Sequence, residues 1–339
     1  MEECRIRYIF GAGASANAIP TVAKFTEELG RWGAYIEEYS TKMRDPIQGK
    51  RLKEISRWFS KTAEHTRQTF SIDTLAKMYW FRKDLLEYNK VKSVISLLIN
   101  LQELKNPCDQ RYDSFLAALM DLKEGDLKFA SSVQLVAWNY DFQFASSYKK
   151  IMGIPAEKMK PIGFENFQKI IRLQNINGSS YNEGSYVINT EHNLDIGNIG
   201  NNNYSTTVRI FCEELLNAFD ITNEQSHWGN IKFSWEREFD HHNLNEFEPD
   251  ILVIIGYSFP TYNRELDLPI LLPNGYPVNK VYIQCNYYDP EKNDDIDGNT
   301  DVKNKLISMG VPHDRIFPIS SSKEFYIPFE FGSDRDVVF

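Results

Sequence analysis

Four stretches of the chain carry near-continuous runs of apolar residues, which is typical of strands buried on both faces of a parallel sheet. These runs lie at residues 5–10, 133–141, 251–259 and 280–286. Each run ends in small or polar residues, which indicates a turn where the strand stops. We therefore expect a parallel sheet whose strands come from both the beginning and the second half of the chain.

The residues between the first two runs have a different periodicity. Apolar side chains recur at helical spacing over 21–37 and again across 40–125, where no convincing strand is found. This pattern predicts an α/β protein with a Rossmann-like, doubly wound parallel sheet and a large helical insertion. We assign 1–38 and 130–339 to the α/β core and 39–129 to the helical insertion, which would act as a cap.

One long segment has neither periodicity. Residues 174–206 are rich in Asn, Gly and Ser, which predicts an irregular loop. Because loops of this length are uncommon in compact domains unless they are functional, we expect a role such as that of a lid.

Charge and hydropathy restrict the class of partner. The 339 residues carry a formal net charge of -9 at pH 7, which argues against a general nucleic-acid-binding surface. The basic stretch 50–67 has interleaved apolar positions, so it predicts an amphipathic helix with a solvated face. We find no signal peptide and no apolar run that could cross a bilayer, and we expect a cytoplasmic protein without a membrane partner.

The four cysteines predict neither disulfides nor a metal centre. Cys4, Cys108, Cys212 and Cys285 stand far apart, and no pair has the C-x-x-C spacing of a zinc ribbon. We expect reduced, buried thiols, no structural zinc and no other metal site.

The first apolar run leads directly into a glycine-rich turn. The stretch "RIRYIFGAGASANAIP" contains Gly11-x-Gly13-x-x-Ala16, which fits the dinucleotide fingerprint in which the third glycine is replaced by alanine. A helix that starts near Ser15 would point its free N–H groups at a pyrophosphate. A tight turn without a ligand is the alternative for a glycine pair after a strand.

Polar side chains follow the other predicted strands at the corresponding place. Asn139 and Asp141 follow the second run, Ser258 follows the third, and Asn286 follows the fourth. In an open parallel sheet the ligand lies beyond the carboxyl ends of the strands, so these residues are candidates for one binding site. For Asn139 and Asp141 a turn that closes the strand is the alternative, because both residue types favour turns.

Four short segments of the chain, or islands, taken in order resemble the sirtuin-like family of NAD-binding proteins. The match consists of "GAGAS" with the following Pro20, "NYD" at 139–141, "IGYSF" at 255–259 and "QCN" at 284–286. The islands span nearly the whole chain, and the sequence between them does not align. The resemblance implies that Gly11, Ala12, Gly13 and Ser15 cradle the pyrophosphate of NAD.

The same resemblance implies roles for the later islands. Asn139 and Asp141 look like the contacts to nicotinamide and its ribose. Gly256 and Ser258 look like a second contact to phosphate and ribose, and Asn286 looks like the residue that meets the adenosine ribose.

Two departures from the family change the expected chemistry. The zinc-containing deacetylases of the family have a four-cysteine ribbon, which this chain cannot build. The chain is more similar to the bacterial branch that hydrolyses NAD, often in defence against phage, with a helical insertion after the glycine turn. In "NINGSS", Asn177 stands where the family places a catalytic His, and an amide does not accept a proton at neutral pH.

Three functions are compatible with these residues. The first is an NAD glycohydrolase that cleaves NAD to nicotinamide and ADP-ribose, with Asn139, Asp141 and Asn177 in the catalytic set. The second is a module that binds NAD or ADP-ribose without turnover, because of Asn177. The third is a serine hydrolase with Ser258 as nucleophile, although Pro260 replaces the second glycine of the usual elbow and His313 is the downstream histidine.

The acidic, aromatic-rich composition permits larger assemblies. We expect NAD or ADP-ribose as the small-molecule partner, and either a homo-oligomer or a defence-complex protein as the macromolecular one.

Overall fold

The fold is taken from a computed structural model of the chain. The structure describes residues 3–69, 71–123, 126–153, 169, 171–180, 207–209, 211–212, 215–216, 230–236, 247–289 and 294–332. Of the loop expected at 174–206, residues 181–206 lie outside the described residues.

A parallel sheet forms the centre of the molecule. Within the described residues its strands run in the order β12-β9-β8-β1-β4-β5, and every neighbouring pair is parallel. The strands are β1 (Ile6–Phe10), β4 (Val133–Ala137), β5 (Leu173–Asn175), β8 (Ile251–Ile255), β9 (Lys280–Gln284) and β12 (Ile316–Pro318). The four apolar runs of the sequence therefore each form a strand of one sheet.

The register brings the carboxyl ends of the central strands to one level. Phe10, the last residue of β1, pairs with Ala137 of β4 on one side and with Ile255 of β8 on the other. Ile255 in turn pairs with Gln284, the last residue of β9. The residues that follow these four strands consequently emerge at the same edge of the sheet.

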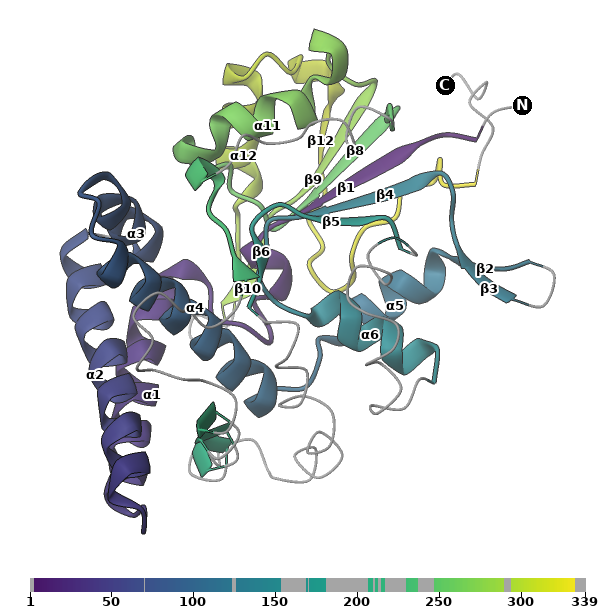
Figure 1. Cartoon of the computed structure of the whole chain (residues 1–339). Helices are drawn as coiled ribbons and strands as arrows, with labels where there is room; N and C mark the ends of the chain where they lie inside the picture. The colour runs from purple at the N-terminus through teal and green to yellow at the C-terminus, as the bar shows by residue number, and fades with distance from the viewer. Residues whose placement is uncertain are drawn as a thin grey trace.

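Helices cover both faces of the sheet (Figure 1). On one face, α5 (Gln110–Ala118) and α6 (Gln143–Ile151) pack against the β1 side chains Tyr8 and Phe10. On the other face, α11 (Arg264–Leu271) and α12 (Asn299–Ser308) pack in one apolar cluster with Ile9. These layers confirm the prediction of a doubly wound, Rossmann-like α/β fold.

The large insertion is helical and has its own apolar core. It contains α2 (Pro46–Thr69), α3 (Ile72–Phe81) and α4 (Leu85–Lys105), and their buried side chains form one cluster with those of α1 (Val22–Thr41). The helix α1 therefore packs with the insertion, although most of it lies in the range that the sequence assigned to the core. In Figure 1 these helices stand on the side of the sheet where β1 ends. The helix α5 lies within the range expected for the insertion but packs on the sheet, through Tyr112, Phe115 and Leu116.

Short antiparallel strand pairs lie outside the central sheet. They are β2 (Met120–Lys123) with β3 (Asp126–Phe129), β6 (Gly178–Ser179) with β7 (Asn230–Ile231), and β10 (Tyr287–Asp289) with β11 (Asp294–Ile296). The strand β2 falls in the range 40–125, where the sequence predicted no strand. In the part of the chain that the structure describes, no helix has both the length and the apolar character needed to span a bilayer.

Candidate functional site

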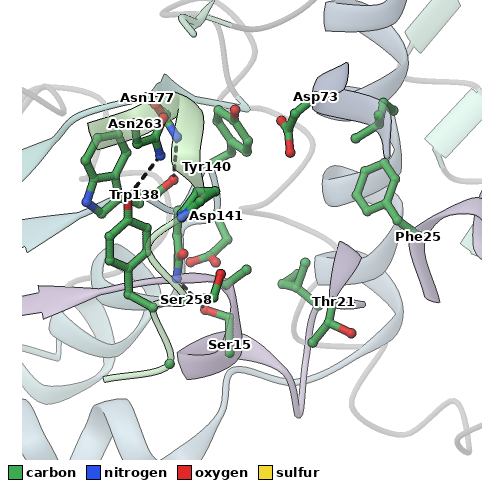
Figure 2. Close-up of a pocket in the computed structure, with 18 of the residues that line it drawn as sticks. Ser15, Thr21, Phe25, Asp73, Trp138, Tyr140, Asp141, Asn177, Ser258 and Asn263 are labelled. Atoms are coloured by element: carbon green, nitrogen blue, oxygen red, sulfur yellow. Dashed lines mark hydrogen bonds between the residues drawn. The ribbon is translucent and has the colours of Figure 1, made fainter. Parts of the chain in front are cut away.

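A cavity of about 400 Å³ lies between the carboxyl edge of the sheet and the helical insertion. One wall consists of the segments that follow β1, β4, β8 and β9, and the opposite wall comes from α1, α3, α4 and residues 233–235. Figure 2 shows side chains from both walls facing the same space. A volume of this size is typical of sites for small molecules and cofactors.

Most residues singled out from the sequence line this cavity. They come from five separate segments of the core and comprise Ala12, Gly13, Ser15, Pro20, Asn139, Asp141, Asn177, Gly256, Ser258 and Asn286. Gly11 is not among the lining residues. The common register of the strands explains the convergence, because the segments that follow the strand ends all begin at the same edge.

The glycines have a packing role that the sequence analysis did not anticipate. A Cβ atom on Gly11 would lie 2.5 Å from Tyr257 Cα, and one on Gly13 would lie 2.9 Å from Gly256 Cα. Gly256 has φ of +61°, and its own Cβ would lie 2.2 Å from the Ala14 nitrogen. The loops after β1 and β8 therefore cross so closely that no side chain fits between them.

This crossing corrects two expectations about the phosphate-binding turn. The Gly13 N–H donates to the Gly256 carbonyl at 2.9 Å, so that amide is already occupied. Residues Ala12–Ser15 form a short 3-10 helix, and the long helix α1 begins at Val22 rather than near Ser15. A phosphate at this turn would therefore meet fewer free amides than the fingerprint implies.

Ser15 is the centre of a polar network at the floor of the cavity. Its hydroxyl lies 2.8 Å from the Tyr112 hydroxyl and accepts a hydrogen bond from Asn139 Nδ2 at 3.1 Å. Ser15 also interacts with the carboxylate of Asp141 and lowers its pKa. The network fixes Asn139 and Asp141 relative to each other.

Asp141 and Asn139 keep acceptor capacity toward the cavity. Desolvation in the wall raises the pKa of Asp141 to about 6, although bonds from Ser15 and from the Gln143 N–H oppose this shift. The side chain of Asn139 is 7% exposed, and its Oδ1 atom has no hydrogen-bond partner. A buried amide oxygen without a partner is costly, so it marks a position where a ligand donor would be accommodated.

Asn177 has a similar arrangement at the other end of the polar wall. It follows β5, and its Nδ2 donates to the backbone carbonyl of Trp138 at 2.9 Å. Its Oδ1 has no partner. The amide is thus held in place with its oxygen available, but it supplies no titrating group.

A rigid aromatic layer supports this wall. The Trp138 and Tyr257 rings stack with centroids 5.2 Å apart. The Tyr257 hydroxyl donates to Asp267 at 2.9 Å and accepts from Asn263 at 2.9 Å. Burial raises the pKa of Asp267 to about 8. These residues hold the loop after β8 in place behind the cavity.

Ser258 and Asn286 are more open, and part of their capacity is used within the fold. The Ser258 carbonyl accepts from Lys305 Nζ at 2.9 Å, while its hydroxyl-bearing side chain is exposed. Asn286 Oδ1 accepts from the Gly298 N–H at 3.1 Å, at the start of α12. Asn286 therefore helps to position the α12 N-terminus at the cavity rim, in addition to lining the cavity.

The wall opposite the strand ends contains residues that the sequence analysis did not identify. Asp73 lies in the first turn of α3 and accepts a hydrogen bond from Tyr262 Oη at 2.9 Å. Trp235 stacks on Phe233 with centroids 4.6 Å apart and meets the Tyr262 ring edge-on. No motif or periodicity distinguishes these positions, because tertiary packing alone brings them to the cavity.

A buried ion pair anchors the aromatic segment to the insertion. Lys92 of α4 contacts Glu236 at 3.0 Å, and both side chains are largely buried. Glu236 also accepts from the Phe233 N–H at 2.6 Å. The segment that carries Trp235 is thereby fixed against α4.

The described residues contain no group of three or more His, Cys, Asp or Glu side chains that could hold a metal ion. All four cysteines are free thiols, and burial raises the pKa of Cys285, which lines the cavity, to about 12. The expectation that no zinc is bound stays a prediction.

No protein-family model matches the sequence, and no significant match exists among the curated proteins. The resemblance to the sirtuin-like family therefore depends on the residues quoted above.

Proposed function

We propose that the chain is an NAD glycohydrolase of the sirtuin-like type, acting in the cytoplasm in bacterial antiphage defence. The observation that carries the enzymatic proposal is the convergence of Ser15, Asn139, Asp141 and Asn177 on one cavity at the carboxyl edge of the sheet. These residues come from three separate segments of the chain, and a doubly wound sheet binds nucleotides at this edge. The unpartnered oxygens of Asn139 and Asn177 suit the hydroxyl-rich ribose of NAD.

The residues of the polar wall fit the demands of this reaction. Hydrolysis breaks the bond between ribose C1′ and the nicotinamide nitrogen, and the electron pair leaves with neutral nicotinamide. Positive charge then develops on the ribose. The Asp141 carboxylate would stabilise that charge, because electrostatic interactions are strong in a desolvated wall. Asn139 Oδ1 would accept a hydrogen bond from a ribose hydroxyl, and Ser15 holds the side chains of Asn139 and Asp141 in position.

The direct test is incubation of the purified protein with NAD, followed by chromatography for nicotinamide and ADP-ribose. We expect release in the wild type, and a loss of at least about 100-fold in Asn139→Ala and in Asp141→Asn, since each removes a polar group aimed at the reacting sugar. The control is Asn304→Ala, which changes an exposed residue on α12 outside the cavity. Equal rates in all four proteins would contradict the site.

A second candidate is a module that binds NAD or ADP-ribose without turnover. It is favoured by Asn177, whose neutral amide stands where the family has its proton acceptor. Calorimetry with NAD separates the two functions. Binding by the wild type without nicotinamide release would establish the module and overturn the hydrolase.

The serine hydrolase receives no support from the arrangement around Ser258. Among the described side chains, no histidine is hydrogen-bonded to Ser258, and His313 lies in the exposed turn before β12. A homo-oligomer or a defence partner remains part of the proposal for the cellular role.

A further inference from the structure

The functional proposal gives no role to Asp73, a carboxylate that lines the cavity. Asp73 lies on the insertion wall, opposite the strand ends, and in Figure 2 its carboxyl group projects into the cavity across from Asn177. The sugar-binding groups described above all come from the core. Asp73 therefore approaches the cavity from the opposite wall, and its carboxylate is available to a different part of the reaction.

One explanation for an acidic residue in the first turn of α3 is that it stabilises the helix terminus. The contacts of Asp73 do not favour this explanation. Acidic residues in the first turn of a helix interact well with its dipole. However, the N-terminus of α3 is already capped by Ser71, whose Oγ accepts from the Thr74 N–H at 3.1 Å. The Asp73 carboxylate instead accepts from Tyr262, a residue of the core.

The surroundings of Asp73 hold its carboxylate in a definite orientation. Tyr262 Oη donates to Oδ2 at 2.9 Å, and this leaves Oδ1 for another donor. Asp73 is close enough to Tyr140 for its charge to raise the pKa of that phenol, together with burial. Burial also raises the pKa of Asp73 above its ordinary value, while the Tyr262 hydrogen bond opposes this shift. A carboxylate with a raised pKa is a better proton acceptor near neutrality.

We propose that Asp73, supplied by the helical insertion, is the general base that activates the attacking water in NAD hydrolysis. This inference depends on the proposed glycohydrolase function and assigns the proton acceptor that Asn177 does not provide. Asp141 and Asp73 then face the reacting sugar from opposite walls, as two carboxylates do in many enzymes that hydrolyse glycosidic bonds. The core stabilises the ribose charge and the insertion delivers the water.

The step balances without a further reactant. The C1′–N bond breaks with its electron pair passing to nicotinamide, and the water oxygen forms the new bond to C1′. One water proton passes to the Asp73 carboxylate and then to solvent. The products are ADP-ribose, neutral nicotinamide and one proton.

The first experiment compares Asp73→Asn with the wild type. The amide keeps the size of the side chain and an acceptor for Tyr262, but it does not take up a proton. We expect nicotinamide release to fall by about 100-fold or more, the usual contribution of a general base, while NAD affinity measured by calorimetry stays close to that of the wild type. Asp84→Asn is the matched control, because Asp84 caps α4 and does not line the cavity.

The second experiment distinguishes a base from a residue that only supports the fold. Azide attacks C1′ without losing a proton, so it needs no base. In Asp73→Ala, sodium azide should give ADP-ribosyl azide, detected by mass spectrometry, whereas Asp141→Asn should give none. Circular dichroism verifies that each variant is folded.

Each outcome decides the assignment. Full activity in Asp73→Asn, with an active wild type, overturns the base and leaves the glycohydrolase intact. Loss of hydrolysis in Asp73→Ala without an azide product makes Asp73 structural and also overturns it. A wild type that binds NAD but releases no nicotinamide overturns the proposed function itself, and the base with it.

Discussion

The carboxylate of Asp141 has to be ionised to stabilise positive charge, and this makes activity dependent on pH. Desolvation raises its pKa to about 6. Above that pH the group is charged, and below it the proton removes the charge. We expect kcat/KM for NAD to fall at least tenfold for each pH unit below 6, and more steeply where Asp73, which must also be ionised to act as the base, takes up its proton. A pH–rate profile checks this, and a profile that stays flat to pH 4.5 would contradict it.

Asp267 makes the stability of the fold depend on pH in a predictable direction. Its side chain is 2% exposed, and burial raises its pKa from 3.8 to about 8. The folded state therefore holds a proton that the unfolded chain releases, so the stabilisation is present below about pH 4 and is lost as the pH rises through 8. Relative to Asp267→Asn, the wild type should lose roughly 4 kcal/mol of unfolding free energy between pH 4 and pH 7.

Urea denaturation of the wild type and Asp267→Asn at a series of pH values measures this difference. Asp314→Asn, which changes an exposed carboxylate in the turn before β12, is the control. Parallel stability curves for the wild type and Asp267→Asn would show that Asp267 does not titrate as expected.

At the scale of elements, the crossing of the β1 and β8 loops depends on glycine. Gly256 has φ of +61°, and a Cβ there would lie 2.2 Å from the Ala14 nitrogen. Gly153 has φ of +58° with no atom within 4 Å of its Cβ position. We expect Gly153→Ala to cost about 1 kcal/mol of unfolding free energy, from backbone strain alone. Gly256→Ala should cost more than about 2 kcal/mol, because the clash adds to the strain.

Chemical denaturation of both variants separates strain from steric clash. Equal losses of stability would mean that the loops move apart without penalty. The same geometry affects ligand-binding tests at Gly13, because a side chain there would meet Gly256 and disturb the loops. A substitution such as Gly13→Val would therefore not separate a loss of binding from a loss of structure.

An element could be predicted from the sequence where its own residues determine it, and could not where contacts to distant residues do. The strands β1, β4, β8 and β9 were predictable, because burial on both faces requires unbroken apolar runs. The start of α1 was not, since the turn after Gly13 forms a 3-10 helix held by contacts to the distant loop at Gly256. The packing of α5 on the sheet was also missed, because helical periodicity shows a buried face and does not name the layer that covers it.

At the scale of the whole molecule, the candidate site was half predictable. The core wall follows from strand order, so Asn139, Asp141 and Ser258 could be placed together from the sequence. The opposite wall depends on how the insertion docks, and nothing local at Asp73, Phe233 or Trp235 reports that docking. One wall of the cavity could thus be predicted from a sequence pattern, whereas the other wall depends on tertiary contacts alone.

The hydrogen bond between Tyr262 and Asp73 links positions 189 residues apart, in two layers with separate apolar cores. Replacing the insertion would remove the partner of Tyr262, and replacing Tyr262 would release the carboxylate on the insertion. The two positions are therefore coupled, although they lie in different layers of the fold.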